Sequence, residues 1–129
     1  MNICDAGAVN LAVGIVNQAV NDYIDALKKI YKLQNKENAY KAIRKRALKS
    51  KKPRELTDEE AETERLHMIA KKKDMLAEIE RFFHSEWYAE LCELDGDFMI
   101  AKAEGKYREW LNEQKCNIAK NKQLRYNNK

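Results

Sequence analysis

Two histidines, His67 and His84, are the first residues to consider as bases or metal ligands. Neither falls in an HExxH motif or in another spacing that brings two ligands onto one helix face. A lone histidine on a helix is usually a surface or core residue. The sequence also has no glycine-rich phosphate loop, no GxSxG elbow and no dinucleotide fingerprint. We therefore predict a non-enzymatic protein, with no catalytic residue and no cofactor.

Four carboxylates, Glu90, Glu93, Asp95 and Asp97, gather around a turn signal at Gly96. Hard cations such as Ca²⁺ bind several oxygen ligands at once, so this cluster is a candidate for metal binding. Its spacing is not that of an EF-hand loop, and helix capping accounts for both aspartates. We predict no metal site here.

Basic residues dominate the stretch 28–54, where twelve Lys and Arg residues stand against a single acidic residue, Glu37. A helix that carries such residues can lie along phosphates and bind nucleic acid with little sequence preference. The candidate contacts are Lys41, Arg44, Lys45, Arg46, Lys49 and Lys52.

Acidic residues prevail farther along the chain. Between residues 55 and 113, seventeen Asp and Glu residues stand against eight Lys and Arg residues, and the net charge of the whole chain is only +4. In a helical bundle these acidic faces can neutralise the basic helix internally, or they can face a partner. Nucleic-acid binding and a charged surface for a protein partner therefore both remain open.

The pattern of apolar residues predicts the elements that carry these groups. With 129 residues, one proline and four glycines, the chain favours a single all-α domain, a bundle of four to five helices. We expect helices at about 8–33 and 36–52, then one opened by Thr57 and a short one after Ser85. Gly96 is expected to end the short helix in a left-handed conformation, and Asp97 to cap a last helix that runs to about residue 122. A linker is expected at about 51–56, and the tail 121–129 is expected to fray.

The apolar residues of the stretch 9–30 alternate in steps of four and three, which is a heptad pattern. The same face suits either the core of the bundle or the seam of a homodimer. The apolar segment 6–20 is interrupted by Asn and Gln and no basic region precedes it, so we expect neither a signal peptide nor a membrane span. Three widely spaced cysteines without CxxC spacing favour a reducing, cytoplasmic location.

Aromatic residues concentrate in the stretch 80–100. The pattern there is Glu80-x-Phe82-Phe83-x-Ser85-x-Trp87-Tyr88-x-x-Leu91-x-x-Leu94-Asp95-Gly96-Asp97-x-x-Ile100. It resembles a stretch in small proteins carried by phages, prophages and mobile elements of Gram-positive bacteria. The resemblance implies an accessory protein made in the cytoplasm of a bacterial host, one that acts by binding nucleic acid or a host factor such as a defence enzyme.

From the resemblance and the residues together, we expect a protein that binds and modulates a host protein, with nucleic-acid binding as the alternative. Aromatic residues near an acidic turn are typical anchors of interfaces. We expect Phe83, Trp87, Leu91 and Ile100 to wedge the junction of the last three helices. The exposed partner contacts are then expected to be Tyr88, Glu90, Asp95 and Asp97.

Overall fold

The computed structural model describes residues 6–127, with side chains described for residues 11–120. Within this range the chain forms α1 (Ala6–Gln34), α2 (Lys36–Leu48), α3 (Asp58–Phe83), α4 (Glu86–Leu91) and α5 (Gly96–Asn127), and no strand. The prediction of an all-α chain with four to five helices is confirmed. No helix in the described range is both long and apolar enough to cross a membrane.

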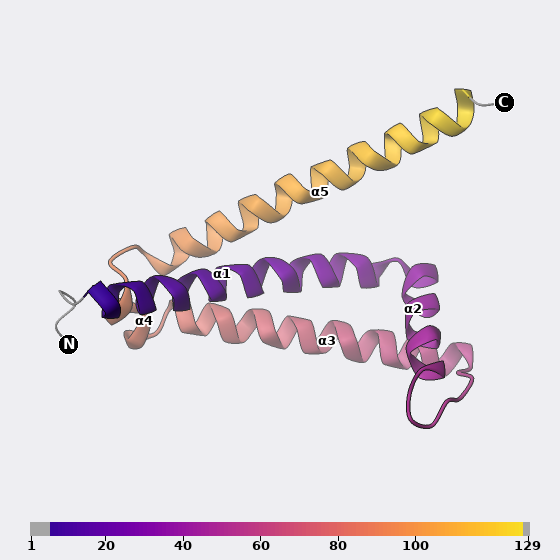
Figure 1. The fold of residues 1–129 in the computed structure, drawn as a ribbon, viewed down its shortest axis with the longest axis horizontal. Coiled ribbons are helices and arrows are strands. Elements are labelled where there is room, and N and C mark those ends of the chain that lie inside the picture. Colours follow the sequence, from indigo (N-terminus) through magenta and orange to yellow (C-terminus); the bar gives the residue numbers. More distant parts are fainter. Residues whose placement is uncertain (1–5, 128–129) are drawn as a thin grey trace.

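The two helices α1 and α3 lie side by side and antiparallel, and they form the long axis of the molecule (Figure 1). The short α2 crosses one end of this pair, and α4 lies at the other end. From the α4 end, α5 runs back along α1 and gradually diverges from it, so that its distal half stands apart from α2 (Figure 1). The molecule therefore has two distinct ends, the α2 end and the α4 end.

The core lies where α1, α3, α4 and α5 meet, and one cluster of buried side chains forms it. Its members are Val16, Val20, Tyr23, Ile24, Phe83, Tyr88, Met99 and Ala103. The heptad positions of α1 from Val16 onward thus serve the core, whereas Val13 is 53% exposed. Val9 lies outside the described side chains. Because the chain itself covers much of this face, the homodimer remains a prediction without support from these contacts.

Local signals set the helix starts as predicted. Thr57 and Glu60 form a capping box, in which the Thr57 side chain accepts from the Glu60 amide at 3.2 Å and the Glu60 carboxylate accepts from the Thr57 amide at 3.3 Å. Ser85 caps α4 by accepting from the Tyr88 amide at 3.1 Å. These short-range contacts depend on a few neighbouring residues, so the sequence suffices to predict them.

The second helix ends at Leu48, four residues before its predicted end. The Ser50 hydroxyl explains the early stop, because it donates to the carbonyl of Ala47 at 2.8 Å and to that of Lys52 at 3.0 Å. A serine that bonds nearby carbonyls offers the backbone an alternative to the helical ladder. The connection to α3 is therefore longer than the predicted linker of about 51–56.

The turn between α4 and α5 corrects two further predictions. Asp95, and not Asp97, caps α5: its side chain accepts from the Asp97 amide at 3.3 Å and its carbonyl from the Met99 amide at 3.2 Å. Gly96 does not supply a left-handed residue, since no described glycine has a positive φ. Its missing Cβ matters instead, because a Cβ would lie 2.0 Å from the carbonyl oxygen of Phe83.

The last helix continues to Asn127, past its predicted end near residue 122. The tail 121–129, for which the sequence predicts fraying, is helical in the described backbone up to Asn127, and residues 128–129 lie outside the described residues.

Candidate binding surface at the α2 end

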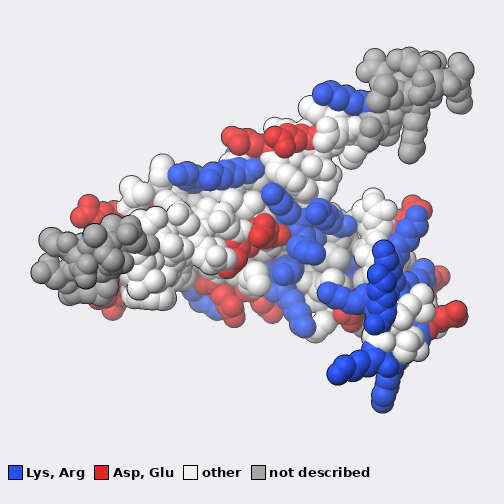
Figure 2. All heavy atoms as spheres, viewed as in Figure 1, with Lys and Arg blue, Asp and Glu red and all other residues white. Residues whose placement is uncertain are grey.

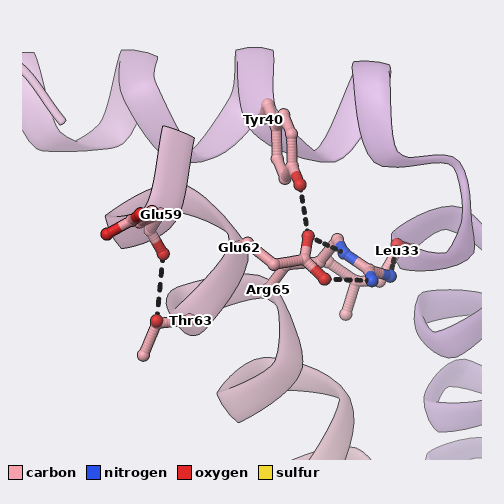
Figure 3. Close-up of polar contacts among 6 residues, drawn as sticks. All are labelled: Leu33, Tyr40, Glu59, Glu62, Thr63 and Arg65. Carbon is pink, nitrogen blue, oxygen red and sulfur yellow. Dashed lines mark hydrogen bonds and ion pairs between the residues drawn. The ribbon is translucent and has the colours of Figure 1, made fainter. Parts of the chain in front are cut away.

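A buried arginine of α3 fixes the corner between α1 and α2. Arg65 is only 8% exposed, and its Nη1 donates to the carbonyl oxygen of Leu33 at 3.1 Å. Leu33 belongs to the last turn of α1, where carbonyls lack the amide partner that helix interiors provide. The other donors of Arg65 bind Glu62 of α3 through Nε at 2.9 Å and Nη2 at 2.6 Å (Figure 3). The buried guanidinium is thus paired with a carboxylate, and it also supplies a donor to one of the free carbonyls at the end of α1.

The same carboxylate also binds α2. The Tyr40 hydroxyl donates to Glu62, so that α1, α2 and α3 share one polar network (Figure 3). The Arg65 hydrogen bonds, followed by that of Tyr40, lower the pKa of the Glu62 carboxyl to about 2. The hydrogen bond to Glu62 raises the pKa of Tyr40. Together with the buried Ala39 and Ile43, this network holds α2 across the end of the α1–α3 pair.

The outer side of α2 and the loop after it carry a dense set of exposed cations, which we call the basic surface. Its members are Lys41, Lys45, Arg46, Lys49, Lys51 and Lys52. Figure 2 shows Lys and Arg atoms gathered over this end of the molecule. Five of the six positions predicted for nucleic-acid binding therefore lie together at this end, Lys41, Lys45 and Arg46 on α2 and Lys49 and Lys52 in the segment after it. Arg44 is half-buried, lies 5.8 Å from the centre of the Tyr40 ring and is paired with Asp58.

The acidic start of α3 neutralises little of this charge. Asp58 pairs with Arg44 and Glu60 with Arg54, while Lys41 makes only an exposed contact of 3.8 Å with Glu37 in its own helix. Among the described side chains, the remaining five members of the basic surface have no carboxylate within 4.0 Å. These are Lys45, Arg46, Lys49, Lys51 and Lys52. The sequence leaves open whether the acidic helix faces neutralise the basic stretch within the molecule. Among the described residues at this end, ion pairs with α3 neutralise Arg44 and Arg54 alone.

Comparison with family models, curated proteins and solved structures finds no match to this chain. The likeness of residues 80–100 to phage and mobile-element proteins therefore stays a prediction. Any functional assignment has to rest on the geometry of the surfaces themselves.

Of the four residues expected to be exposed partner contacts at the α4 end, one is buried. Tyr88 is 3% exposed, and its hydroxyl donates to the carbonyl oxygen of Leu94 at 2.8 Å, so it is a core residue and no exposed contact. Burial is the main reason that its pKa is raised. Its neighbour Trp87, expected in the core, is 55% exposed. The two aromatic residues have exchanged the roles that the sequence suggested.

The three acidic residues predicted for this surface, Glu90, Asp95 and Asp97, are exposed as expected. Asp97 lies 2.5 Å from Nε2 of His84, and this hydrogen bond raises the pKa of the imidazole. The described residues contain no cluster of three or more His, Cys, Asp or Glu side chains placed to hold a metal. The acidic turn and the basic surface lie at opposite ends of the α1–α3 pair (Figure 1), so they are two separate surfaces.

Sequence reasoning misses two residues that matter at the α2 end. Arg65 follows a run of glutamates and resembles an exposed helix residue, and only the position of the α1 terminus reveals its role. The apolar spacing of the last helix leaves open whether Trp110 or Leu111 belongs to its buried stripe, and in the structure Trp110 is half-buried and packs edge-on against Tyr31 at 5.6 Å. The feature of the sequence that could have drawn attention to Trp110 is the occurrence of a tryptophan among many charged residues late in the chain.

Proposed function

We propose that this protein is a non-enzymatic binding protein whose basic surface binds the phosphates of a nucleic acid. The observation that carries the proposal is the set of five exposed cations at the α2 end without a described carboxylate in reach. Lys and Arg residues that gain phosphate partners release counterions from the nucleic acid, which favours binding at moderate salt. Cations already held by carboxylates would gain far less.

Rigid presentation supports the same proposal. The Arg65–Glu62–Tyr40 network and the buried face of α2 fix the helix backbone, so its lysines project from an ordered scaffold. Preorganisation reduces the entropy that binding has to overcome. Acidic residues also lie at this end, at the start of α3, but the ion pairs they make with described basic residues there are those of Asp58 with Arg44 and Glu60 with Arg54. The exposed cations of the basic surface are therefore available to attract a polyanion.

A second candidate function, binding to a host protein, rests on the α4 end. Three large apolar side chains there, Trp87, Leu94 and Phe98, are each more than half exposed, next to the acidic Glu90 and Asp95. Exposed tryptophan is a frequent anchor of protein interfaces. In this proposal the protein acts in the cytoplasm of a bacterial host and modulates a host factor, as the resemblance implies.

Fluorescence anisotropy with a labelled 30-nucleotide DNA, single-stranded and duplex, tests the main proposal. We expect binding at 50 mM salt that weakens steeply at 200 mM. The double variant K45E/K49E is expected to weaken binding at least about tenfold, as two phosphate contacts become repulsive. The matched double variant K102E/K106E makes the same charge change on α5 and is expected to bind within about twofold of the wild type. Absence of binding at 50 mM salt would exclude this function.

The second candidate needs a different experiment. Pulldown from a bacterial lysate is expected to capture a stoichiometric protein that D95R or W87A loses and K45E/K49E retains. If D95R and W87A capture that protein as well as the wild type does, the α4 end is not its binding surface.

A further inference from the structure

A groove lies beside the basic surface, between the last turns of α1, the start of α2 and the distal half of α5. Its volume is about 680 Å³, which is within the range of small-ligand sites. Along this side α5 diverges from α1 and α2 (Figure 1), and the lining residues come from these three helices and from Met68 of α3. The groove is therefore a consequence of the fold and belongs to no single helix.

Aromatic and cationic groups meet in this groove. Trp110 lines the groove, packs edge-on against Tyr31 and stacks on Tyr107 with ring centres 6.1 Å apart. The ammonium group of Lys32, also in the lining, lies 6.0 Å from the centre of the Trp110 ring, and that of the neighbouring Lys28 lies 5.4 Å from it. A tryptophan ring with lysines over it is the combination that proteins use to stack a base and hold its phosphate. When a base stacks on Trp110, a displaced ammonium can move to the phosphate of the same nucleotide.

Side-chain amides supply the polar part of the lining. Gln34, Asn35, Asn38 and Gln114 border the groove, and none of the described lining residues is acidic. An amide has both donors and acceptors, so it can pair with the edge of a base. A carboxylate would repel the phosphates of a bound strand, and the described lining contains none.

The groove continues directly into the basic surface along one face of α2. Asn38 and Ala42 line the groove, and Lys45 and Lys49 follow at spacings of three and four residues, which places all four on the same helix face. A strand that follows this face would lay its backbone on the lysines and present a base to Trp110. The groove and these two lysines of the basic surface therefore lie along one face of α2.

We propose that this groove binds an unpaired base, so that the ligand of the basic surface is a single-stranded nucleic acid. The inference rests on the proposed function and narrows its ligand class. A duplex keeps its bases stacked on one another, so it can occupy the lysines but not the Trp110 ring. An acidic amphipathic helix would also suit the lysines and the apolar lining residues, but the side-chain amides of Gln34, Asn38 and Gln114 offer donors and acceptors that a base edge can use.

The experiment compares three DNA ligands at the same salt concentration: a 15-mer of deoxythymidine, an abasic 15-mer with the same phosphates, and a 15-base-pair duplex. Tryptophan fluorescence and anisotropy are both recorded. We expect the deoxythymidine strand to bind at least about fivefold more tightly than the abasic strand and to quench emission, as stacking on an aromatic side chain does. The variant W110F is expected to keep the affinity and lose most of the quenching, whereas W110L loses the fivefold advantage.

The outcomes separate the inference from the function on which it rests. Equal, salt-dependent affinity for all three ligands without quenching would overturn the base-binding groove and leave phosphate binding standing. If no DNA binds and an acidic helical peptide quenches Trp110, the groove is a peptide site and both proposals fall. Circular dichroism checks that W110L folds, and the abasic comparison needs no variant at all.

Discussion

The guanidinium of Arg65 donates a hydrogen bond of 3.1 Å to the carbonyl oxygen of Leu33, and this bond links α3 to the last turn of α1. The bond uses one of the carbonyls that a helix leaves without a partner at its C-terminus, and a cation at that end also interacts favourably with the helix dipole. Because Arg65 simultaneously holds Glu62, which receives Tyr40 from α2, one side chain determines the relative placement of three helices.

We expect R65A to destabilise the protein and to loosen α2 before the rest of the fold. The substitution leaves the Leu33 carbonyl without a donor and leaves Glu62 with the Tyr40 hydroxyl alone. Losing one member of a buried network costs more than losing an exposed pair. Urea unfolding and hydrogen exchange of the α2 amides measure the two effects. R108A is the matched control, since Arg108 is exposed and only 3.6 Å from Glu104; its effect is expected to stay within about 0.5 kcal/mol. Equal effects of R65A and R108A would contradict the role of Arg65.

The network also predicts how stability depends on pH. Glu62 has a pKa of about 2 in the folded protein, below the value of about 4.3 for a glutamate in an unfolded chain. The folded state binds the proton more weakly, so the contribution of Glu62 is complete above about pH 4.3 and is lost as the pH falls towards 2. E62Q is expected to be less stable than the wild type near pH 7 and to show a shallower loss of stability below about pH 4.3. Urea midpoints between pH 2 and 7 measure this, with E64Q as the control.

A contact between Gly96 and Phe83 predicts opposite effects of two glycine substitutions in α5. In G96A the new Cβ would lie 2.0 Å from the Phe83 carbonyl oxygen, so the backbone has to shift, and we expect a loss of at least about 1–3 kcal/mol in the free energy of unfolding. A Cβ added at Gly105 would meet no neighbouring atom within 4 Å, so G105A is expected to stabilise the helix by about 0.5–1 kcal/mol. Thermal unfolding of both variants decides whether Gly96 is required for close approach.

The features that the sequence predicts well are local. The capping box at Thr57 and the cap at Ser85 involve residues three positions apart, and the periodic apolar positions of α1 after Val16 need only the helical repeat. The site is predicted less well, because its decisive contacts join distant parts of the chain. Arg65 contacts Leu33 across 32 positions, and nothing around Arg65 in the sequence distinguishes it from an exposed arginine.

The exchange of Trp87 and Tyr88 shows a second limit. Helix α4 has only six residues, too few for an apolar period to reveal which face is buried. Its rotation is set instead by the Ser85 cap and by the hydrogen bond from Tyr88 to the Leu94 carbonyl. The turn after it is likewise set by the approach of Gly96 to Phe83, which no turn motif encodes.

This exchange gives a direct test by mutation. Y88F removes the hydroxyl that donates to Leu94 and is expected to cost about 1 kcal/mol, while Y88A opens a cavity and is expected to cost about 3–5 kcal/mol. W87A loses mainly an edge contact of 5.5 Å with Phe82 and is expected to cost about 0.5–1.5 kcal/mol. Chemical denaturation followed by circular dichroism ranks the variants, and a larger loss in W87A than in Y88A would contradict the observed rotation of α4.

The basic surface also predicts how the salt dependence of nucleic-acid binding changes when its lysines are removed. The logarithm of the binding constant falls linearly with the logarithm of the salt concentration, by about 0.7 per phosphate contact for a single strand. The neutral double variant K45Q/K49Q removes two exposed cations without an ion-pair partner among the described residues, so we expect its slope to be shallower by about 1.4. K102Q/K106Q removes the same charge from the proximal half of α5 and is expected to keep the slope of the wild type. If both variants lower the slope equally, the affinity comes from overall charge and α2 has no special part in it.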